Sequence, residues 1–326
     1  MDRKRNSPEK SGNRIPYYET TQDPRLYTSC TKSISTSISS YSYYIPPKWR
    51  VNPNHIDKVA ECMRKYDLPR TAEILNGHFD PLLMEYQEHD SETRKFIISE
   101  AVKRLSEEER EGLLEKVLTN PQMFEDDTII SELRDGIISG VINAKLLEEG
   151  YVELELKPQQ YGRLEFNVPP ERKLDIDLKG AYPKIFVKNE GEVYLRGAEN
   201  TELNVLSNDG NIEIEGETKE IDLDCGTGTV RVSGRVGHVK QQAQVLVAYE
   251  IGRLDQRQLN CKDTPICVAK IIEEVHLFNN KNNPGKVFAY KIDNISGVNG
   301  KIVTGNESNI GEMIRVEVWK GWEKIR

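Results

Sequence analysis

The spacing of apolar residues changes near Gly150, from the three-and-four spacing of helices to the alternation of strands. Over residues 51–150, runs such as Ile129 to Leu146 predict about five short helices packed as a small bundle. Helix starts are indicated at Asn54, at Ser106 followed by Glu109 in a capping-box arrangement, and at Asp127 or Thr128. We therefore expect a helical domain over 51–150.

Residues 151–326 alternate apolar and polar positions over short segments, as half-buried strands do. The expected inward pairs are Val193/Leu195, Leu203/Val205, Ile212/Ile214, Ile221/Leu223 and Val230/Val232, with Val245/Val247, Ile266/Val268 and Val275/Leu277 continuing less regularly. The first members of the first five pairs are separated by 10, 9, 9 and 9 residues. This regular spacing favours a β-solenoid with about eighteen residues per turn. The alternative is an antiparallel meander or sandwich, in which Asp209-Gly210 would form a hairpin turn.

Residues 1–50 fit neither pattern. They hold nine basic and four acidic residues, six tyrosines, and a Ser/Thr-rich centre. Such a segment buries too little apolar surface to offset the entropy of ordering, which predicts a disordered basic tail. A second interpretation makes Arg3, Lys4 and Arg5 part of an arm that contacts an anionic partner. The chain as a whole is thus expected to be α+β: a tail, an all-α domain and an all-β domain over 151–326.

The β region contains the segment LSNDGNIEIEGETKEIDLDCGTGTVRVSG, with a repeating Gly-x-[Ile/Val]-x-[Ile/Val]-x-Gly pattern. Residues of about 185–250 resemble the β-solenoid repeats of bactofilin-type cytoskeletal proteins and of adhesin-head-like bacterial domains. The resemblance covers about a fifth of the chain. It implies scaffolding, polymerisation or surface contact rather than chemistry. The long helical domain departs from the bactofilin arrangement of a solenoid between short tails, which argues against filament formation.

Composition narrows the classes of function. With 53 acidic and 45 basic residues the formal charge is -8, which argues against a dedicated nucleic-acid binder. Five cysteines without a Cys-x-x-Cys pair indicate neither a disulfide framework nor a zinc site. No apolar run is long enough to span a membrane and no signal peptide is apparent. We expect a cytoplasmic protein with no cofactor and no metal.

One motif suggests cofactor binding. The run Ile221 to Gly228 resembles the first motif of class I methyltransferases, in which a strand enters a glycine-rich turn beside S-adenosylmethionine. The resemblance implies cofactor-binding candidates at Asp222, Gly226, Gly228 and Glu250. Asp224 stands where that motif has its first glycine, and the segment after the turn is β-branched rather than helical. A turn of the solenoid is therefore the favoured interpretation.

Other residues that could act as catalytic groups or ligands have simpler structural explanations. The carboxylate pairs Asp175/Asp177, Glu213/Glu215 and Asp222/Asp224 each share a strand face, as in carbohydrate-cleaving solenoids, but charged outward rows also keep sheets soluble. His55, His78 and His89 lie near aspartates without a metal or catalytic spacing, and Cys62 falls on an apolar helix face. Trp319 and Trp322 are expected to cap the end of the solenoid.

These observations favour a non-enzymatic scaffold, in which helices bind protein partners and the solenoid self-associates through its ends. No catalytic residue is assigned. The alternative is an enzyme: either a methyltransferase-like cofactor binder at Asp222 to Gly228 or a carbohydrate-acting solenoid that uses outward carboxylates.

Overall fold

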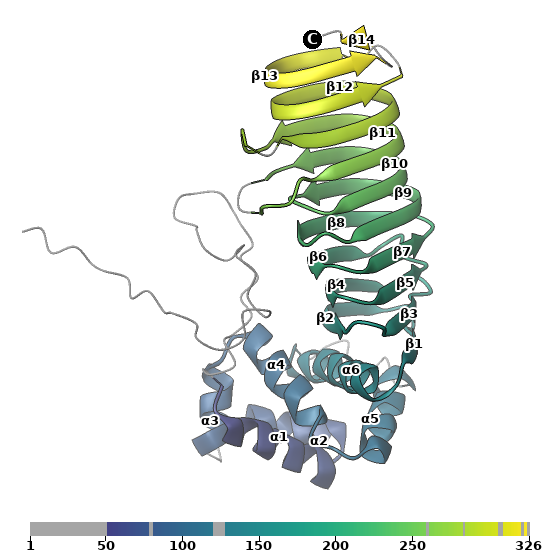
Figure 1. Ribbon diagram of the computed structural model, residues 1–326. Helices are drawn as coiled ribbons and strands as arrows, with labels where there is room; N and C mark the ends of the chain where they lie inside the picture. Colours follow the sequence, from purple (N-terminus) through teal and green to yellow (C-terminus); the bar gives the residue numbers. More distant parts are fainter. Residues whose placement is uncertain are drawn as a thin grey trace, which may run out of the picture.

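The computed structural model describes residues 51–77, 81–119, 128–258, 261–282, 284–305, 309–320 and 323–324. Within these ranges, six helices form the lower part of the molecule and a β-solenoid of about eight turns rises from them (Figure 1). Every pairing from β1 to β13 is parallel, and only β13 and β14 pair antiparallel. The α+β solenoid is confirmed and the meander with a hairpin at Asp209-Gly210 is wrong. The predicted tail lies outside the described residues.

The described helices are α1 (Pro53–Lys65), α2 (Leu68–Asn76), α3 (Pro81–Glu88), α4 (Ser91–Val102), α5 (Glu107–Thr119) and α6 (Thr128–Glu148). Four of them, α1, α2, α4 and α5, begin where a side chain satisfies a free backbone N–H group. The Asn52 side chain accepts from the Asn54 amide, so α1 starts earlier than the predicted Asn54. Ser106 and Glu109 form the expected capping box, each side chain bonded to the other's backbone N–H.

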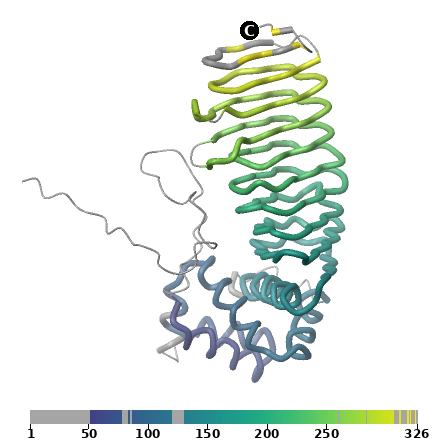
Figure 2. Tube along the Cα trace, viewed as in Figure 1, coloured from purple at the N-terminus to yellow at the C-terminus, as the bar shows by residue number. Residues whose placement is uncertain are grey.

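The solenoid has two opposed sheets. Its strands are β1 (Tyr151–Glu155), β2 (Gln160–Val168), β3 (Lys173–Asp177), β4 (Tyr182–Asn189), β5 (Glu192–Arg196), β6 (Glu202–Asn208), β7 (Asn211–Glu215), β8 (Thr218–Cys225), β9 (Thr229–Gln241), β10 (Val245–Gln256), β11 (Ile266–Phe278), β12 (Gly285–Thr304), β13 (Asn309–Lys320) and β14 (Glu323–Lys324). The odd face consists of β1, β3, β5, β7 and the first segments of β9 to β12. The even face consists of β2, β4, β6, β8 and the second segments of β9 to β12. The last segment of β12, residues 300–304, returns to the odd face above the first. Strands β9 to β12 are long because each bends from the first face to the second (Figure 2).

Inward side chains stack in register from turn to turn. Val193, Ile212, Val230 and Leu246 occupy successive places in one such row, and all four are fully buried. The five regular inward pairs predicted from the sequence are confirmed, as is Val275/Leu277. The pairs Val245/Val247 and Ile266/Val268 were assigned to the wrong side. Because both sides of β10 and β11 are apolar, alternation alone does not identify the inner side.

A row of buried amides lies at the corner where the chain passes from the even face back to the odd face. Its members are Asn189, Asn208, Gln241, Gln244, Gln256, Gln258 and Asn279. The amide nitrogen of Asn189 donates to Asn208 Oδ1 at 2.9 Å, and that of Asn208 donates to Gln244 Oε1 at 3.3 Å. Several of these side chains also bond backbone carbonyls, whereas Gln256 Oε1, Gln258 Oε1 and Asn279 Nδ2 are buried without a hydrogen-bond partner.

Helix α6 covers the first turn of the solenoid. Asp135, Ser139 and Asn143 lie four residues apart on its solenoid side and bond the backbone of the edge strand β2. Asp135 accepts from the Gly162 amide at 3.0 Å and Ser139 from the Glu165 amide at 3.0 Å. Helices and strands therefore share one continuous hydrophobic core, and these β2 backbone groups are not open to another strand.

Candidate functional site

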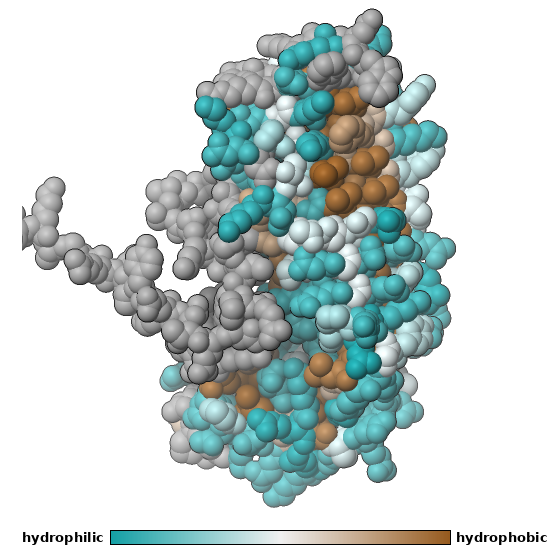
Figure 3. Space-filling view, viewed as in Figure 1, coloured by the Kyte–Doolittle hydropathy of each residue, from teal (hydrophilic) through white to brown (hydrophobic). Residues whose placement is uncertain are grey.

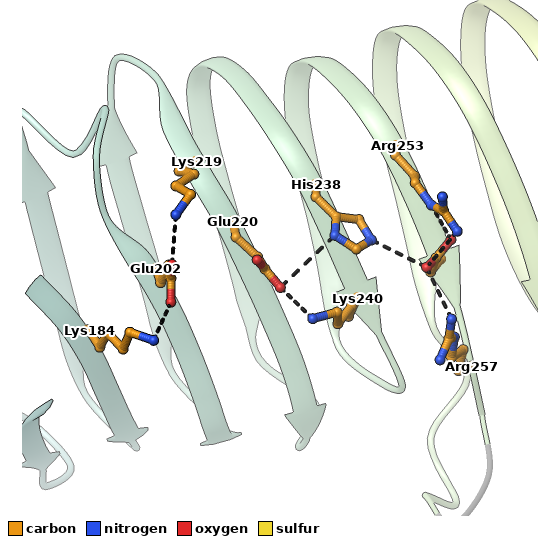
Figure 4. Close-up of polar contacts among 9 residues, drawn as sticks. Lys184, Glu202, Lys219, Glu220, His238, Lys240, Arg253 and Arg257 are labelled. Atoms are coloured by element: carbon orange, nitrogen blue, oxygen red, sulfur yellow. Dashed lines mark hydrogen bonds and ion pairs between the residues drawn. The ribbon is translucent and has the colours of Figure 1, made fainter. Parts of the chain in front are cut away.

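The even face carries a charged ladder that crosses five strands (Figure 4). Its members are Lys184, Glu202, Lys219, Glu220, His238, Lys240, Arg253, Asp255 and Arg257. Glu202 Oε1 lies 2.7 Å from Lys219 Nζ, and Glu202 Oε2 lies 3.0 Å from Lys184 Nζ. These two lysines hold the pKa of Glu202 below its usual value. Carboxylates and cations are therefore matched from turn to turn along this face.

Asp255 is the most enclosed member of the ladder, with a side chain 2% exposed. His238 Nε2 lies 3.2 Å away, Arg253 Nε 3.0 Å and Arg257 Nη2 3.3 Å. Burial opposes the charge of this carboxylate, but the bonds from His238 and Arg253 outweigh burial and hold its pKa well below the usual range. Two arginines and a histidine around one buried carboxylate stabilise the stack, and the low pKa of Asp255 leaves it unsuited to proton transfer near neutral pH.

The glycines of the methyltransferase-like motif lie at the amide corner. Gly226 has φ +109°, and a Cβ there would come within 2.1 Å of the Asn208 carbonyl oxygen. A Cβ on Gly228 would come within 2.4 Å of the Gly210 carbonyl oxygen. Both glycines thus permit one turn to approach the preceding turn, a requirement that holds whether or not a ligand binds. Glu250 lies at the opposite corner, where it pairs with Arg235 at 3.0 Å, so the structure does not bring it to the glycines.

Asp224 is the most perturbed carboxyl in this region. Burial, with a further contribution from the charge of Asp222 on the same strand, raises its pKa to about 7, and a 2.7 Å bond from Gln242 Nε2 opposes the rise. Cys261 also lies here, with its Sγ 3.2 Å from the Asp224 carbonyl oxygen and 2.8 Å from Cys225 Sγ. Burial raises the pKa of the Cys261 thiol to about 12, so that sulfur is protonated at neutral pH.

The other predicted carboxylate pairs lie on the odd face beside cations. Arg196 contacts Asp175 at 3.0 Å and Glu153 at 3.5 Å. Arg231 lies 3.6 Å from Glu213. Such half-exposed pairs contribute little stability individually, about 0–1 kcal/mol each, and they set the charge pattern of the face.

Of the helical-domain residues that the sequence singled out as possible site residues and that the structure describes, only two are brought together. His55 is buried, and its ring meets that of His89 edge-on with centroids 5.6 Å apart. His78 lies outside the described residues, as does Trp322, and nothing is described of the Trp319 side chain. Cys62 is buried at 3% exposure among apolar neighbours, as expected from its helix face. Within the described ranges, no group of three His, Cys, Asp or Glu residues is placed to hold a metal ion.

The odd face carries a surface that sequence reasoning missed. Outward positions of β10 to β12 form an apolar strip made of Val245, Val247, Tyr249, Ile266, Val268, Phe288 and Tyr290. Val247, Val268 and Phe288 are in register on adjacent strands. Tyr290 is 74% exposed. Figure 3 shows apolar residues gathered in the upper part of the solenoid, above a mostly hydrophilic lower part. The sequence signal for this strip is that consecutive residues at the starts of β10 and β11 are apolar, so both sides of these strands are apolar.

None of the described helices is long and apolar enough to cross a membrane. Comparison with known proteins gives no match to this chain among family models, curated proteins or solved structures.

Proposed function

We propose that this protein is a non-enzymatic scaffold. The observation that carries the proposal is the shared core between α6 and the first turn of the solenoid. Polar bonds from Asp135, Ser139 and Asn143 to β2 reinforce this junction. A scaffold has to hold separate surfaces at fixed positions, and a helical module fused to a rod does so without a hinge. The resemblance to bactofilin-type repeats supports the same class of function.

The charged ladder agrees with a structural role. Its carboxylates lie against lysine, arginine or histidine, as Glu202 and Asp255 illustrate. A glycosidase site instead needs two carboxyl groups that face a common cleft, one of them protonated at neutral pH. Rows of matched charge fit the stabilisation of successive turns and the solubility of a long sheet face.

One observation favours the carbohydrate-acting alternative. Asp224 has a pKa raised to about 7 by burial and by Asp222, and a carboxyl of that kind suits general acid catalysis. The two aspartates project from the same strand face, two residues apart.

A thermal-shift screen with S-adenosylmethionine and with acidic oligosaccharides separates the classes. The scaffold predicts no rise in melting temperature with either ligand. A rise that disappears in Asp222→Asn or Asp224→Asn would support an enzyme and overturn the scaffold. These variants are preferable to Gly226→Val, because valine at that position collides with Asn208 and unfolds the turn.

The rigidity of the connection between the helices and the solenoid is tested by spin labels at Glu115→Cys on α5 and Lys281→Cys after β11, both exposed positions. A fused scaffold gives one narrow distance distribution between the labels. A broad distribution would contradict the proposal, because the two parts would then move independently.

A further inference from the structure

The upper part of the even face carries a chain of polar contacts outside the charged ladder. It joins Glu274 and His276 on β11 to Ser296 on β12. His276 and Ser296 are in register on these adjacent strands, and both are partly exposed. His276 Nδ1 lies 2.7 Å from Ser296 Oγ, and His276 Nε2 lies 3.4 Å from Glu274 Oε2. A hydroxyl, an imidazole and a carboxylate are thus connected on the surface of the solenoid.

Glu274 determines the tautomer of His276. An ionised carboxylate only accepts hydrogen bonds, so Nε2, the nitrogen that faces it, carries the proton of the neutral ring. Nδ1 then holds the lone pair and accepts the hydroxyl proton of Ser296. A serine bonded in this way to an oriented imidazole is an activated nucleophile.

The next strand leaves the outer side of Ser296 open. The register between β12 and β13 shifts between Ile295 and Gly297, so β13 has one extra residue beside Ser296. Gly311 takes the outward place next to Ser296, where a Cβ would lie 3.5 Å from the Ser296 Cβ. Because this place is held by an exposed glycine, no side chain from it covers the hydroxyl.

The surroundings of Ser296 indicate the class of group that it takes. Phe278, two residues after His276 on the same face of β11, is 45% exposed and offers an apolar surface beside the pair. A phosphoryl group would bring further negative charge close to Glu274, whereas an uncharged acyl group would not. An acyl donor that carries an apolar group is therefore favoured.

We infer that Ser296 is a covalent acceptor of an acyl group from an activated ester or thioester. His276 acts as its general base and Glu274 as the positioning residue of that base. The inference goes beyond the scaffold function, because it assigns a modification site to the even face.

The reaction balances without any further reactant. Ser296 Oγ attacks the carbonyl carbon of the donor while His276 Nδ1 takes the hydroxyl proton. The tetrahedral adduct then collapses, the bond to the leaving oxygen or sulfur breaks, and the imidazolium returns the proton to the leaving group. The products are an acyl ester of Ser296 and a free alcohol, phenol or thiol.

The test uses the full chain and p-nitrophenyl acetate, an aryl ester that releases coloured nitrophenolate. Wild type is expected to gain an acetyl ester on Ser296, located by peptide mass spectrometry and removed by hydroxylamine, which spares acetylated lysines. His276→Ala should slow acetylation of Ser296 by roughly 100-fold, the loss expected for a general base. Glu274→Gln should slow it by roughly 10-fold, because the orientation of the base is weakened.

Ser233 is the matched control within the same chain. It is an exposed serine of β9 whose Oγ accepts from the Gly216 N–H at 2.9 Å. Its acetylation should be slow and unchanged in the His276 and Glu274 variants. Circular dichroism melts confirm that the variants are folded, and a fluorophosphonate probe gives a second readout on wild type, in which it should label Ser296 and spare Ser233.

Acetylation of Ser296 no faster than that of Ser233, or a rate unchanged in folded His276→Ala, would overturn the inference. Absence of fluorophosphonate labelling at Ser296 would do the same. None of these results affects the scaffold proposal. Conversely, continuous release of nitrophenolate that is lost in Ser296→Ala would contradict a non-enzymatic scaffold and would confirm Ser296 as the acyl acceptor.

Discussion

At the scale of single residues, Asn208 is the most connected side chain of the amide corner. It accepts from the Asn189 amide and the Gly210 N–H, and it donates to Gln244 and to the Thr229 carbonyl oxygen. Asn208→Ala leaves these buried groups unsatisfied, and we expect it to lower the free energy of unfolding by about 2–4 kcal/mol. Urea denaturation measures the change.

Asn211→Ala is the control for that prediction. Its side chain is exposed on the odd face of the adjacent strand, and the expected change is below about 0.5 kcal/mol. Equal losses in the two variants would show that the buried amide row contributes no specific stability.

The pH dependence of stability should report on Asp224. The pKa of this carboxyl is ordinarily 3.8 and is about 7 in the folded state, so between these values the folded state binds more protons than the unfolded state. Stability contributed by this group is therefore present at low pH and falls as pH rises from about 4 to 7. Asp224→Asn, which retains an acceptor for Gln242, should be more stable than wild type at pH 8 by about 1–2 kcal/mol.

The difference between wild type and Asp224→Asn should shrink toward zero at about pH 3, below the ordinary pKa of 3.8, where the wild-type carboxyl is mostly protonated in both states. Thermal unfolding at the two pH values measures it, with exposed Glu215→Gln as the control. A gain that is the same at both pH values would exclude titration of Asp224 as its cause.

At the scale of elements, the junction of α6 with β2 depends on Asn143. Its Nδ2 donates to the Glu165 carbonyl oxygen at 2.9 Å and its Oδ1 accepts from the Asn167 amide at 2.8 Å. Asn143→Ala should destabilise the protein by about 2 kcal/mol and speed hydrogen exchange at the Asn167 amide. Leu147→Ala, on the same helix but 61% exposed, should change neither quantity. Unaltered exchange at Asn167 in Asn143→Ala would contradict this account.

The sequence was most informative where each strand is apolar on one side only. From Val193 to Val232 alternation identified the inward residues, because charged residues occupy the other side. At β10 the alternation was ambiguous, and register with β9, which stacks Leu246 on Val230, decided the inner side. The apolar strip therefore could not be assigned from the sequence, although its residues were visible there.

The amide corner could be predicted only in part from the sequence, for a different reason. Asn189-x-Gly191 and Asn208-x-Gly210 recur nineteen residues apart, which is a usable signal. The later members, such as Gln244 and Gln256, follow turns of other lengths and break the spacing. Similarly, the proximity of His238 to Asp255 follows from strand bending at the opposite corner, which no local pattern indicates.

At the scale of the whole molecule, each turn contacts its neighbours only, so a whole turn should be removable. Deletion of residues 192–210 joins Gly191 to Asn211 and replaces the Asn208-x-Gly210 corner with the equivalent Asn189-x-Gly191. Strand β7 would then pair with β3, and β8 with β4, in register. We expect a folded protein whose spin-label distance from α5 to the end of β11 shortens by about 4.8 Å. Deletion of ten residues, which exchanges the two faces, should not fold.

The fixed rise of the turns makes the molecule a ruler. Five strand pairings separate β1, beside the helical domain, from β10, where the apolar strip begins. At about 4.8 Å each, they set roughly 24 Å between the two surfaces. This distance changes only in whole steps, since half a turn would put the strip on the other face. Duplication or loss of a turn would thus give variants of this chain a graded series of spans with the same two ends.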